Sequence, residues 1–221
     1  MQAMVCWVFM VPVVALAADT TLALLGSSTA AGVGASSPPF SWAGLLGSWQ
    51  EQSGNGRLLN LAEPGALTSS GLCNKDRRPS GGLARQSKNS VESALALGAR
   101  RIILAYPSND LVAGWPAKRT LDNIASMAAC ARNAGAVVAV MSSLPRAQLT
   151  PAQIVTMGEI NQALRQHFGT CFIDVHQALS DVRSNEARAE YAAGDGVHFN
   201  DQGHRILYAH VRAFVESARC L

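Results

Sequence analysis

Ser28, Asp195 and His198 are the residues whose types best fit nucleophilic catalysis. A serine hydroxyl is a weak nucleophile until a base removes its proton, and a neutral imidazole is a suitable base. Asp195 precedes His198 by three residues, so its carboxylate can reach the ring and hold it in one tautomer. These side chains predict acyl transfer through a covalent intermediate on Ser28.

An acyl-transfer site also needs hydrogen-bond donors for the oxyanion that forms when the carbonyl is attacked. The backbone N–H groups of Ser28 and Gly65 are two candidates, and the side-chain amide of Asn109 is a third. A glycine suits position 65 because it lets the backbone approach a substrate closely. The sequence therefore predicts an oxyanion hole made by Ser28, Gly65 and Asn109.

Short apolar runs alternate along the chain with amphipathic stretches. The runs are aliphatic or β-branched, as in strands buried on both faces, and they cover residues 20–25, 57–61, 101–106, 136–141 and 171–175. The amphipathic stretches predict helices over residues 40–52, 83–97, 119–133, 151–167 and 202–218. Gly98 and Gly135 fit C-terminal helix caps, and Thr150 before Pro151 fits an N-cap.

Five strands that alternate with helices predict one parallel sheet covered by helices on both faces. In such a sheet, ligands bind outside the carboxyl ends of the strands. Ser28, Gly65 and Asn109 each follow a predicted strand, and residues 194–200 precede the last predicted helix. The elements therefore place all the candidate residues at one edge of the sheet.

In type and order, these residues resemble the SGNH hydrolase family, also called GDSL hydrolases. Ser28, Gly65, Asn109 and the Asp195-x-x-His198 pair follow the family's order over nearly the whole chain after residue 17. The resemblance implies a single SGNH hydrolase domain over residues 18–221, with a three-layer α/β/α, flavodoxin-like fold and strand order 2-1-3-4-5. Ser28 is then the nucleophile of a triad with Asp195 and His198. Gly65 and Asn109 complete the oxyanion hole, and carboxylic esters are hydrolysed without a metal or an organic cofactor.

Two positions depart from the family's usual motifs. Ser27 stands where the first block usually has Asp, and Pro107 stands where the third block usually has Gly. Ser27 keeps a hydroxyl for a local hydrogen bond, whereas Pro107 removes a backbone donor and fixes φ beside Asn109. We expect altered support around the site, because neither change removes a reacting group.

Each motif by itself has a simpler interpretation. Asn109-Asp110 is typical of a turn or a helix cap. Asp195 and His198 fit a surface pair or half of a metal site. Further metal ligands are not evident in the nearby sequence, so no metal is predicted.

Other residues are candidates for lining the substrate pocket. Trp115 follows Asn109, and His176 follows the fifth predicted strand, where a structural role is its alternative. The loops 36–42 and 72–82 are candidate pocket walls because they contain aromatic residues and prolines. His204 lies inside the last predicted helix, and this position fits packing or solvent exposure.

The same acyl-enzyme permits a second activity. An O-acyltransferase would pass the acyl group from Ser28 to an alcohol or a sugar hydroxyl instead of water. A non-catalytic carbohydrate-binding relic of the enzyme is a third interpretation, which the intact set of Ser28, Asp195 and His198 disfavours. The modest predicted loops favour small-molecule or carbohydrate esters over long-chain lipid esters as substrates.

Composition limits the class of protein and its partners. The chain has 221 residues, of which 48% are hydrophobic and 15% are charged, and this suits one domain with a sizeable core. The net charge is only +3, and the densest basic patch is Arg77-Arg78, so nucleic acid is not predicted as a partner. No oligomeric state follows from the sequence.

The first 17 residues form an apolar segment that ends in Ala15-Leu16-Ala17. This ending fits cleavage by signal peptidase, and the segment is too short to cross a bilayer comfortably. We therefore predict a cleaved signal peptide over residues 1–17, export to the periplasm or the medium, and no stable membrane insertion after cleavage. A buried first strand and a misassigned start codon are the alternatives, the latter because no positive charge opens the segment.

Four cysteines follow this segment: Cys73, Cys130, Cys171 and Cys220. An even number of cysteines in an exported protein favours at least one disulfide. The spacing leaves all three pairings open, and four thiols that pack as small hydrophobic groups are the alternative. No Cys-x-x-Cys spacing and no His-Glu-x-x-His motif indicate a zinc site.

Overall fold

The computed structural model describes residues 21–76, 87–106, 108–181 and 184–221. Its centre is a five-stranded sheet with the order β2-β1-β3-β4-β5, in which every neighbouring pair is parallel. The strands are β1 (Leu22–Gly26), β2 (Leu58–Asn60), β3 (Arg101–Ala105), β4 (Val137–Met141) and β5 (Phe172–Ile173). The predicted topology and strand order are therefore confirmed.

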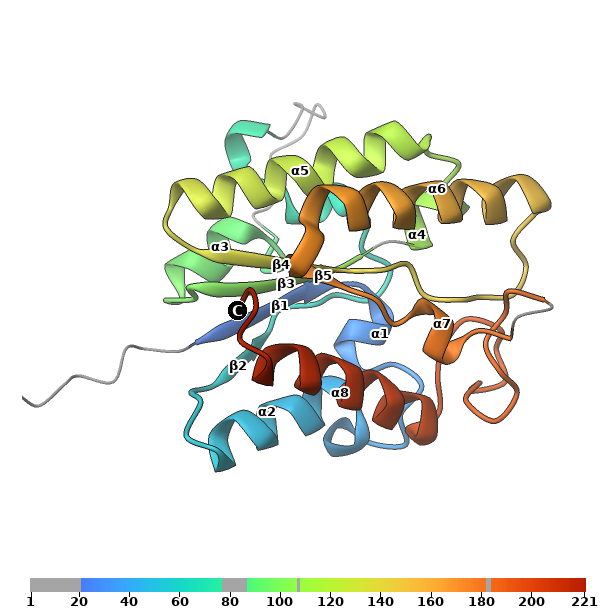
Figure 1. Ribbon diagram of the computed structural model, residues 1–221, viewed down its shortest axis with the longest axis horizontal. Helices are drawn as coiled ribbons and strands as arrows, with labels where there is room; N and C mark the ends of the chain where they lie inside the picture. Colours follow the sequence, from blue (N-terminus) through green and yellow to red (C-terminus); the bar gives the residue numbers. More distant parts are fainter. Residues whose placement is uncertain (1–20, 77–86, 107, 182–183) are drawn as a thin grey trace, which may run out of the picture.

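Helices cover both faces of this sheet (Figure 1). The α-helices are α1 (Ser28–Ala31), α2 (Trp42–Gln52), α3 (Val91–Ala96), α4 (Ser108–Val112), α5 (Ala117–Asn133), α6 (Pro151–Phe168), α7 (His176–Leu179) and α8 (Asp201–Glu216). Short 3₁₀ turns lie at Pro38–Phe40, Thr68–Gly71, Asn74–Asp76 and Gly169–Cys171. In Figure 1, α3, α5 and α6 lie above the sheet, and α2 and α8 lie below it.

The two faces of β1 explain why the core has two halves. Ala23 and Leu25 point into the cluster beneath α3, α5 and α6, whereas Leu22 and Leu24 point towards α2 and α8. Side chains alternate between the faces of a strand, so a strand that is covered on both faces must be apolar throughout. All five residues of β1 are buried, which makes this strand the rigid base for the segment that follows it.

Local signals set several ends of the helices. Thr150 caps α6 through its side chain and forms a capping box with Gln153. Gly98 and Gly135 follow α3 and α5 with positive φ angles of 88° and 78°, a conformation that glycine adopts without strain. α3 begins only at Val91 because the Ser90 side chain caps it there, later than the predicted start at residue 83.

Two disulfides settle the pairing that the spacing left open. Cys73 is joined to Cys130, and Cys171 is joined to Cys220. The first ties the segment after the β2 end to α5, and the second ties the start of β5 to the C-terminus.

The predicted signal peptide over residues 1–17 lies outside the described residues. Within the described ranges, no helix has both the length and the apolar character that a membrane span requires.

Candidate active site

Ser28 lies immediately beyond the carboxyl end of β1. It is the first residue of α1, where a backbone N–H has no partner inside the helix. The short turn into α1 requires close packing, because a Cβ on Gly26 would stand 2.5 Å from the Ala105 carbonyl oxygen. β1 and its glycine therefore hold Ser28 at the carboxyl end of the sheet, where its backbone N–H donates to none of the described residues in the turns and loops.

His198 contacts the Ser28 hydroxyl. Its Nε2 lies 2.8 Å from Ser28 Oγ, and its Nδ1 lies 2.5 Å from Asp195 Oδ2. The carboxylate accepts the proton on Nδ1, which leaves Nε2 as the basic nitrogen that faces the hydroxyl. The three predicted residues are thus brought together in the geometry of a serine–histidine–aspartate triad.

The Asp195 carboxylate is oriented by its own turn. One oxygen accepts the backbone N–H groups of Val197 and His198, at 2.9 and 2.8 Å, and the other accepts the His198 ring. The His198 backbone N–H, the His198 ring and the Val197 N–H hold the pKa of the Asp195 carboxyl well below its usual range. The carboxylate therefore stays charged, and the exposure of its side chain, 51%, also favours the charged form.

Gly65 and Asn109 follow the two strands that neighbour β1. β1 has β2 and β3 as its neighbours, and these two strands lead into the loops that carry Gly65 and Asn109. The two loops meet, because Asn109 Nδ2 donates to the carbonyl of Ala66 at 3.1 Å. Gly65 has a φ of 78°, and a Cβ there would meet nothing within 4 Å. The arrangement leaves open space beside a glycine backbone, as an oxyanion hole needs.

Asn89 clamps the end of β1 to the end of β3, and the sequence alone did not indicate it. Its side chain accepts the Gly26 N–H at 3.0 Å and donates to the Gly26 carbonyl at 2.8 Å. The Tyr106 hydroxyl donates to the same amide oxygen at 2.7 Å. Because Asn89 is fully buried, these bonds fix the backbone two residues before Ser28.

Asp110 joins the segments that carry the proposed oxyanion-hole residues. Its fully buried carboxylate accepts the Thr68 N–H at 3.0 Å, the Thr68 hydroxyl at 2.5 Å and the Thr120 hydroxyl at 2.9 Å. These bonds join α4, which carries Asn109, to the loop after β2 and to α5. Asn109 and Asp110 therefore make long-range hydrogen bonds, in contrast to the local bonds of a simple turn.

Arg146 is a second residue that the sequence did not single out. It follows β4 in the loop 142–150, and its Nη1 lies 3.4 Å from Asn109 Oδ1. Burial lowers the pKa of the guanidinium, while the negative charge of Asp195 opposes that shift. Its sequence signal is its position after the fourth apolar run, because sites in such sheets lie beyond the carboxyl ends of the strands.

The structure separates the other candidate residues by their contacts. His176 begins α7, and its ring nitrogens lie 2.9 Å from the Ser143 carbonyl and 2.9 Å from Asn185 Oδ1, which supports its structural alternative. Trp115 follows α4 and stacks under the Arg119 guanidinium, 3.5 Å from the ring centre. Among the described residues, neither forms a hydrogen bond or an ion pair with the triad.

The two departures from the family motif have different outcomes. Ser27 is the N-cap of α1, and its side chain makes no hydrogen bond that caps this helix. Its backbone N–H instead donates to the Ala105 carbonyl at 3.3 Å. Pro107 lies outside the described residues.

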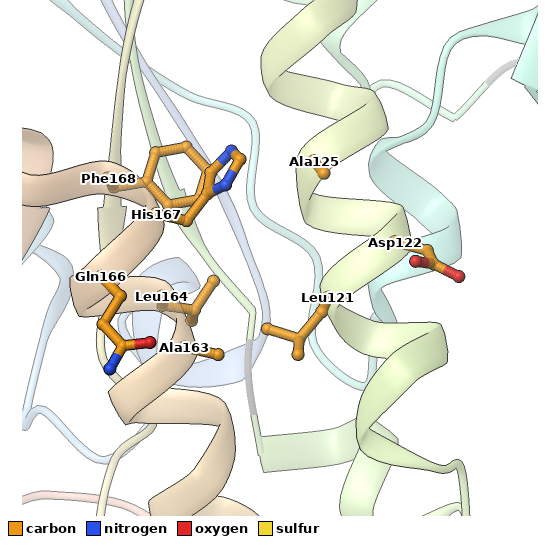
Figure 2. A pocket seen from close by; sticks show the side chains of 8 residues that line it. All are labelled: Leu121, Asp122, Ala125, Ala163, Leu164, Gln166, His167 and Phe168. Atoms are coloured by element: carbon orange, nitrogen blue, oxygen red, sulfur yellow. The ribbon is translucent and has the colours of Figure 1, made fainter.

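One hollow of the described residues lies apart from the triad. Figure 2 shows a space of about 440 Å³ between α5 and α6. Its lining consists of Leu121, Asp122, Ala125, Ala163, Leu164, Gln166, His167 and Phe168. Its lining contains no serine or cysteine nucleophile, so it is not part of the candidate active site. In the described ranges, no group of three or more His, Cys, Asp and Glu side chains is placed to hold a metal ion.

Comparison with known proteins agrees with this arrangement. The model of the GDSL-like lipase/acylhydrolase family matches residues 24–206. No curated protein sequence matches the chain. Among solved structures, TesA is 21% identical with a TM-score of 0.66, over 89% of this chain and 98% of TesA.

Two further structures share the fold. The psychrotrophic esterase EstA from Pseudoalteromonas sp. is 14% identical with a TM-score of 0.63, over 90% of this chain and 98% of EstA. A GDSL-like lipase from Bacteroides thetaiotaomicron is 17% identical with a TM-score of 0.68, over 90% of this chain and 89% of the lipase. At such identities the structures report the fold, and the family match covers most of the chain. The protein is therefore a member of the GDSL-like lipase/acylhydrolase family.

Proposed function

We propose that this protein is a serine hydrolase that cleaves carboxylic esters through an acyl-enzyme on Ser28. The observation that carries the proposal is the continuous chain from Asp195 Oδ2 through the His198 ring to Ser28 Oγ, with contacts of 2.5 and 2.8 Å. Family membership supports the same class of reaction. The mechanism below follows from these contacts.

The first half of the reaction forms the acyl-enzyme. Ser28 Oγ attacks the ester carbonyl carbon while His198 Nε2 accepts the hydroxyl proton, and Asp195 stabilises the resulting imidazolium. The carbonyl oxygen becomes an oxyanion, which takes hydrogen bonds from the N–H groups of Ser28 and Gly65 and from Asn109 Nδ2. When the intermediate collapses, the bond to the alcohol oxygen breaks and the alcohol leaves with the proton from His198.

The second half releases the acid. Water attacks the acyl carbon, His198 accepts its proton, and the same donors hold the second oxyanion. Ser28 then leaves with that proton and the free enzyme is restored. The half-exposed Asp195 side chain indicates that water reaches this edge of the sheet, which favours hydrolysis over transfer to another alcohol.

Hydrolysis of p-nitrophenyl esters over a series of acyl lengths tests this function. We expect Ser28→Ala to lower kcat/KM by about 10³-fold or more, because the nucleophile is lost while the fold remains. Ser69→Ala, which removes a hydroxyl from the 3₁₀ turn at Thr68–Gly71, is the matched control. A Ser28→Ala variant with wild-type turnover would falsify the proposal, and an added alcohol in the same assay measures acyl transfer directly.

A phosphonate gives a second, independent readout. EstA was crystallised with monoethylphosphonate as inhibitor. If Ser28 is the nucleophile here, Ser28 Oγ should displace the leaving group of an activated ethylphosphonate ester, and the peptide that contains Ser28 should gain the mass of the phosphonyl group in place of the hydroxyl proton. Labelling of any other residue, with Ser28 unmodified, contradicts the assignment.

We also propose that the protein is exported. Two disulfides persist most readily in an oxidising compartment, and the apolar segment over residues 1–17 fits a leader. Small-molecule or carbohydrate esters outside the cytoplasm are then the substrates to examine first.

A further inference from the structure

The loop after β4 brings a positive charge to the active site. The Ala147 N–H donates to the Gly196 carbonyl at 2.7 Å, so this loop packs directly against the turn that contains Asp195. The neighbouring side chain, Arg146, extends to Asn109, where Nη1 lies 3.4 Å from the amide oxygen. The guanidinium therefore lies between the proposed oxyanion donor and the turn of the triad.

This guanidinium has more donors than partners. An arginine offers five N–H donors, and the Asn109 amide oxygen is the acceptor that the described residues supply to Arg146. Its Nε is shielded from solvent and makes no hydrogen bond within the described ranges. None of the ion pairs between described residues includes Arg146, and the nearby Asp195 carboxylate is occupied by His198 and Val197.

A half-buried cation without an anionic partner raises the free energy of the folded protein, and a bound anion would offset this cost. The planar fork of an arginine matches a carboxylate, which can accept two parallel hydrogen bonds. An anion that binds here would lie beside Asn109, and thus close to the carbonyl that Ser28 attacks. A structural ion pair would join the guanidinium to a carboxylate, and no described carboxylate forms such a pair with Arg146.

We propose that Arg146 binds a carboxylate of the substrate, so that the enzyme prefers esters with an acidic group close to the scissile carbonyl. This inference rests on the proposed ester hydrolase function and narrows its substrate class to half-esters of dicarboxylic acids and similar acidic esters. The carboxylate of the substrate pairs with the guanidinium, while the ester carbonyl lies in the oxyanion hole.

A second role for Arg146 must be distinguished from this one. By donating to Asn109 Oδ1, the guanidinium also orients the amide so that Nδ2 faces Ala66 and the oxyanion hole. Loss of this orientation would lower kcat for every ester alike, since the oxyanion forms with all of them. Loss of a carboxylate contact would chiefly raise KM for the acidic esters.

A pair of matched substrates separates the two roles. Monoethyl succinate carries a carboxylate, and ethyl levulinate has a neutral methyl ketone in the same place. We expect the wild-type protein to prefer the acidic ester, and Arg146→Met to lose about tenfold or more additional kcat/KM on the acidic ester relative to the neutral one. Arg146→Lys keeps the charge without the fork and should recover part of the preference.

Controls keep the test decisive. Arg100→Met removes an exposed arginine just before β3, at the amino ends of the strands and so away from the site, and should leave the ratio between the two substrates unchanged. Thermal unfolding of Arg146→Met establishes that the variant is folded. Equal losses on both substrates, or a wild type without preference, overturn the carboxylate site while ester hydrolysis stands. A wild type that cleaves no ester in either panel overturns the proposed function and this inference together.

Discussion

The hydroxyl of Ser28 depends on a partner from the far end of the chain. His198 lies 170 residues later and approaches the serine with Nε2, while its Nδ1 is held by Asp195. The charge of Asp195 is secured by backbone N–H groups of its own turn, so the imidazole keeps one orientation. The reactivity of the Ser28 hydroxyl therefore depends on the unprotonated Nε2 that faces it.

The oxyanion hole can be tested through one side chain. Asn109→Ala removes the amide donor that lies against Ala66, and we expect kcat to fall by about 10²–10³-fold with a smaller change in KM. The loss falls on kcat because the donor acts on charge that develops only in the transition state. Steady-state kinetics on one ester measure the effect. Asn133→Ala, at the exposed end of α5, is the control, and a kcat for Asn109→Ala within twofold of wild type contradicts the assignment.

At the scale of elements, α8 is joined to α2 and to the loop after α1 through one buried imidazole. The Trp42 N–H donates to His204 Nδ1 at 3.2 Å, so the proton of the ring lies on Nε2, which contacts the Val33 carbonyl at 3.2 Å. Sequence analysis left His204 between packing and solvent exposure, and the structure places it in the core. The bond to Trp42 requires a neutral ring.

Acid should therefore weaken this junction. Burial lowers the pKa of His204, whereas a histidine in the unfolded chain titrates near its ordinary value of about 6.5. Below that value the unfolded state binds a proton that the folded state does not, so the free energy of unfolding decreases as pH falls. We expect this group to contribute at most about 1.4 kcal/mol per pH unit.

Urea unfolding between pH 7.5 and 5.5 measures this slope. His204→Asn keeps an acceptor for Trp42 without a titrating ring, so its stability should fall less steeply with acid than that of the wild type. His210→Gln removes an exposed histidine from the same helix and should retain the wild-type slope. Equal slopes for His204→Asn and the wild type would show that His204 does not carry the effect.

For the whole molecule, the two disulfides restrain segments far apart in the chain. They close separations of 57 and 49 residues, one towards α5 and one at the C-terminus. Such cross-links stabilise chiefly by limiting the unfolded chain, and the effect depends only weakly on loop length. The two bonds should therefore contribute similar amounts.

Paired alanine variants test that expectation. We expect Cys73→Ala with Cys130→Ala, and separately Cys171→Ala with Cys220→Ala, each to lower the free energy of unfolding by about 2–4 kcal/mol. The two losses should add in the quadruple variant, because the pairs share no partner. Denaturant unfolding with and without a reducing agent measures both effects. A reducing agent that leaves the wild-type midpoint unchanged would contradict the expectation.

Much of the architecture could be predicted from short-range patterns. The apolar runs predicted all five strands, because a strand buried on both faces has few alternatives to aliphatic residues. The right-handed crossover rule then restricted the topology. The ends of single helices were harder to predict. α3 begins at Val91 because the Ser90 side chain caps it, and hydrophobic periodicity does not show where such a cap forms.

Ser28, Gly65, Asn109, Asp195 and His198 could be proposed from the sequence because their types and their order along the chain resemble those of SGNH hydrolases, and because the first three follow predicted strands. What only the tertiary structure decided are the contacts across strands: the 2.8 Å approach of His198 to Ser28, the clamp of Asn89 on Gly26, the cysteine pairing and the unpaired charge of Arg146. Residue types indicate the local secondary structure and chemistry. Contacts between residues 63 or 170 positions apart depend instead on the strand order and on how the loops pack at the carboxyl ends of the strands.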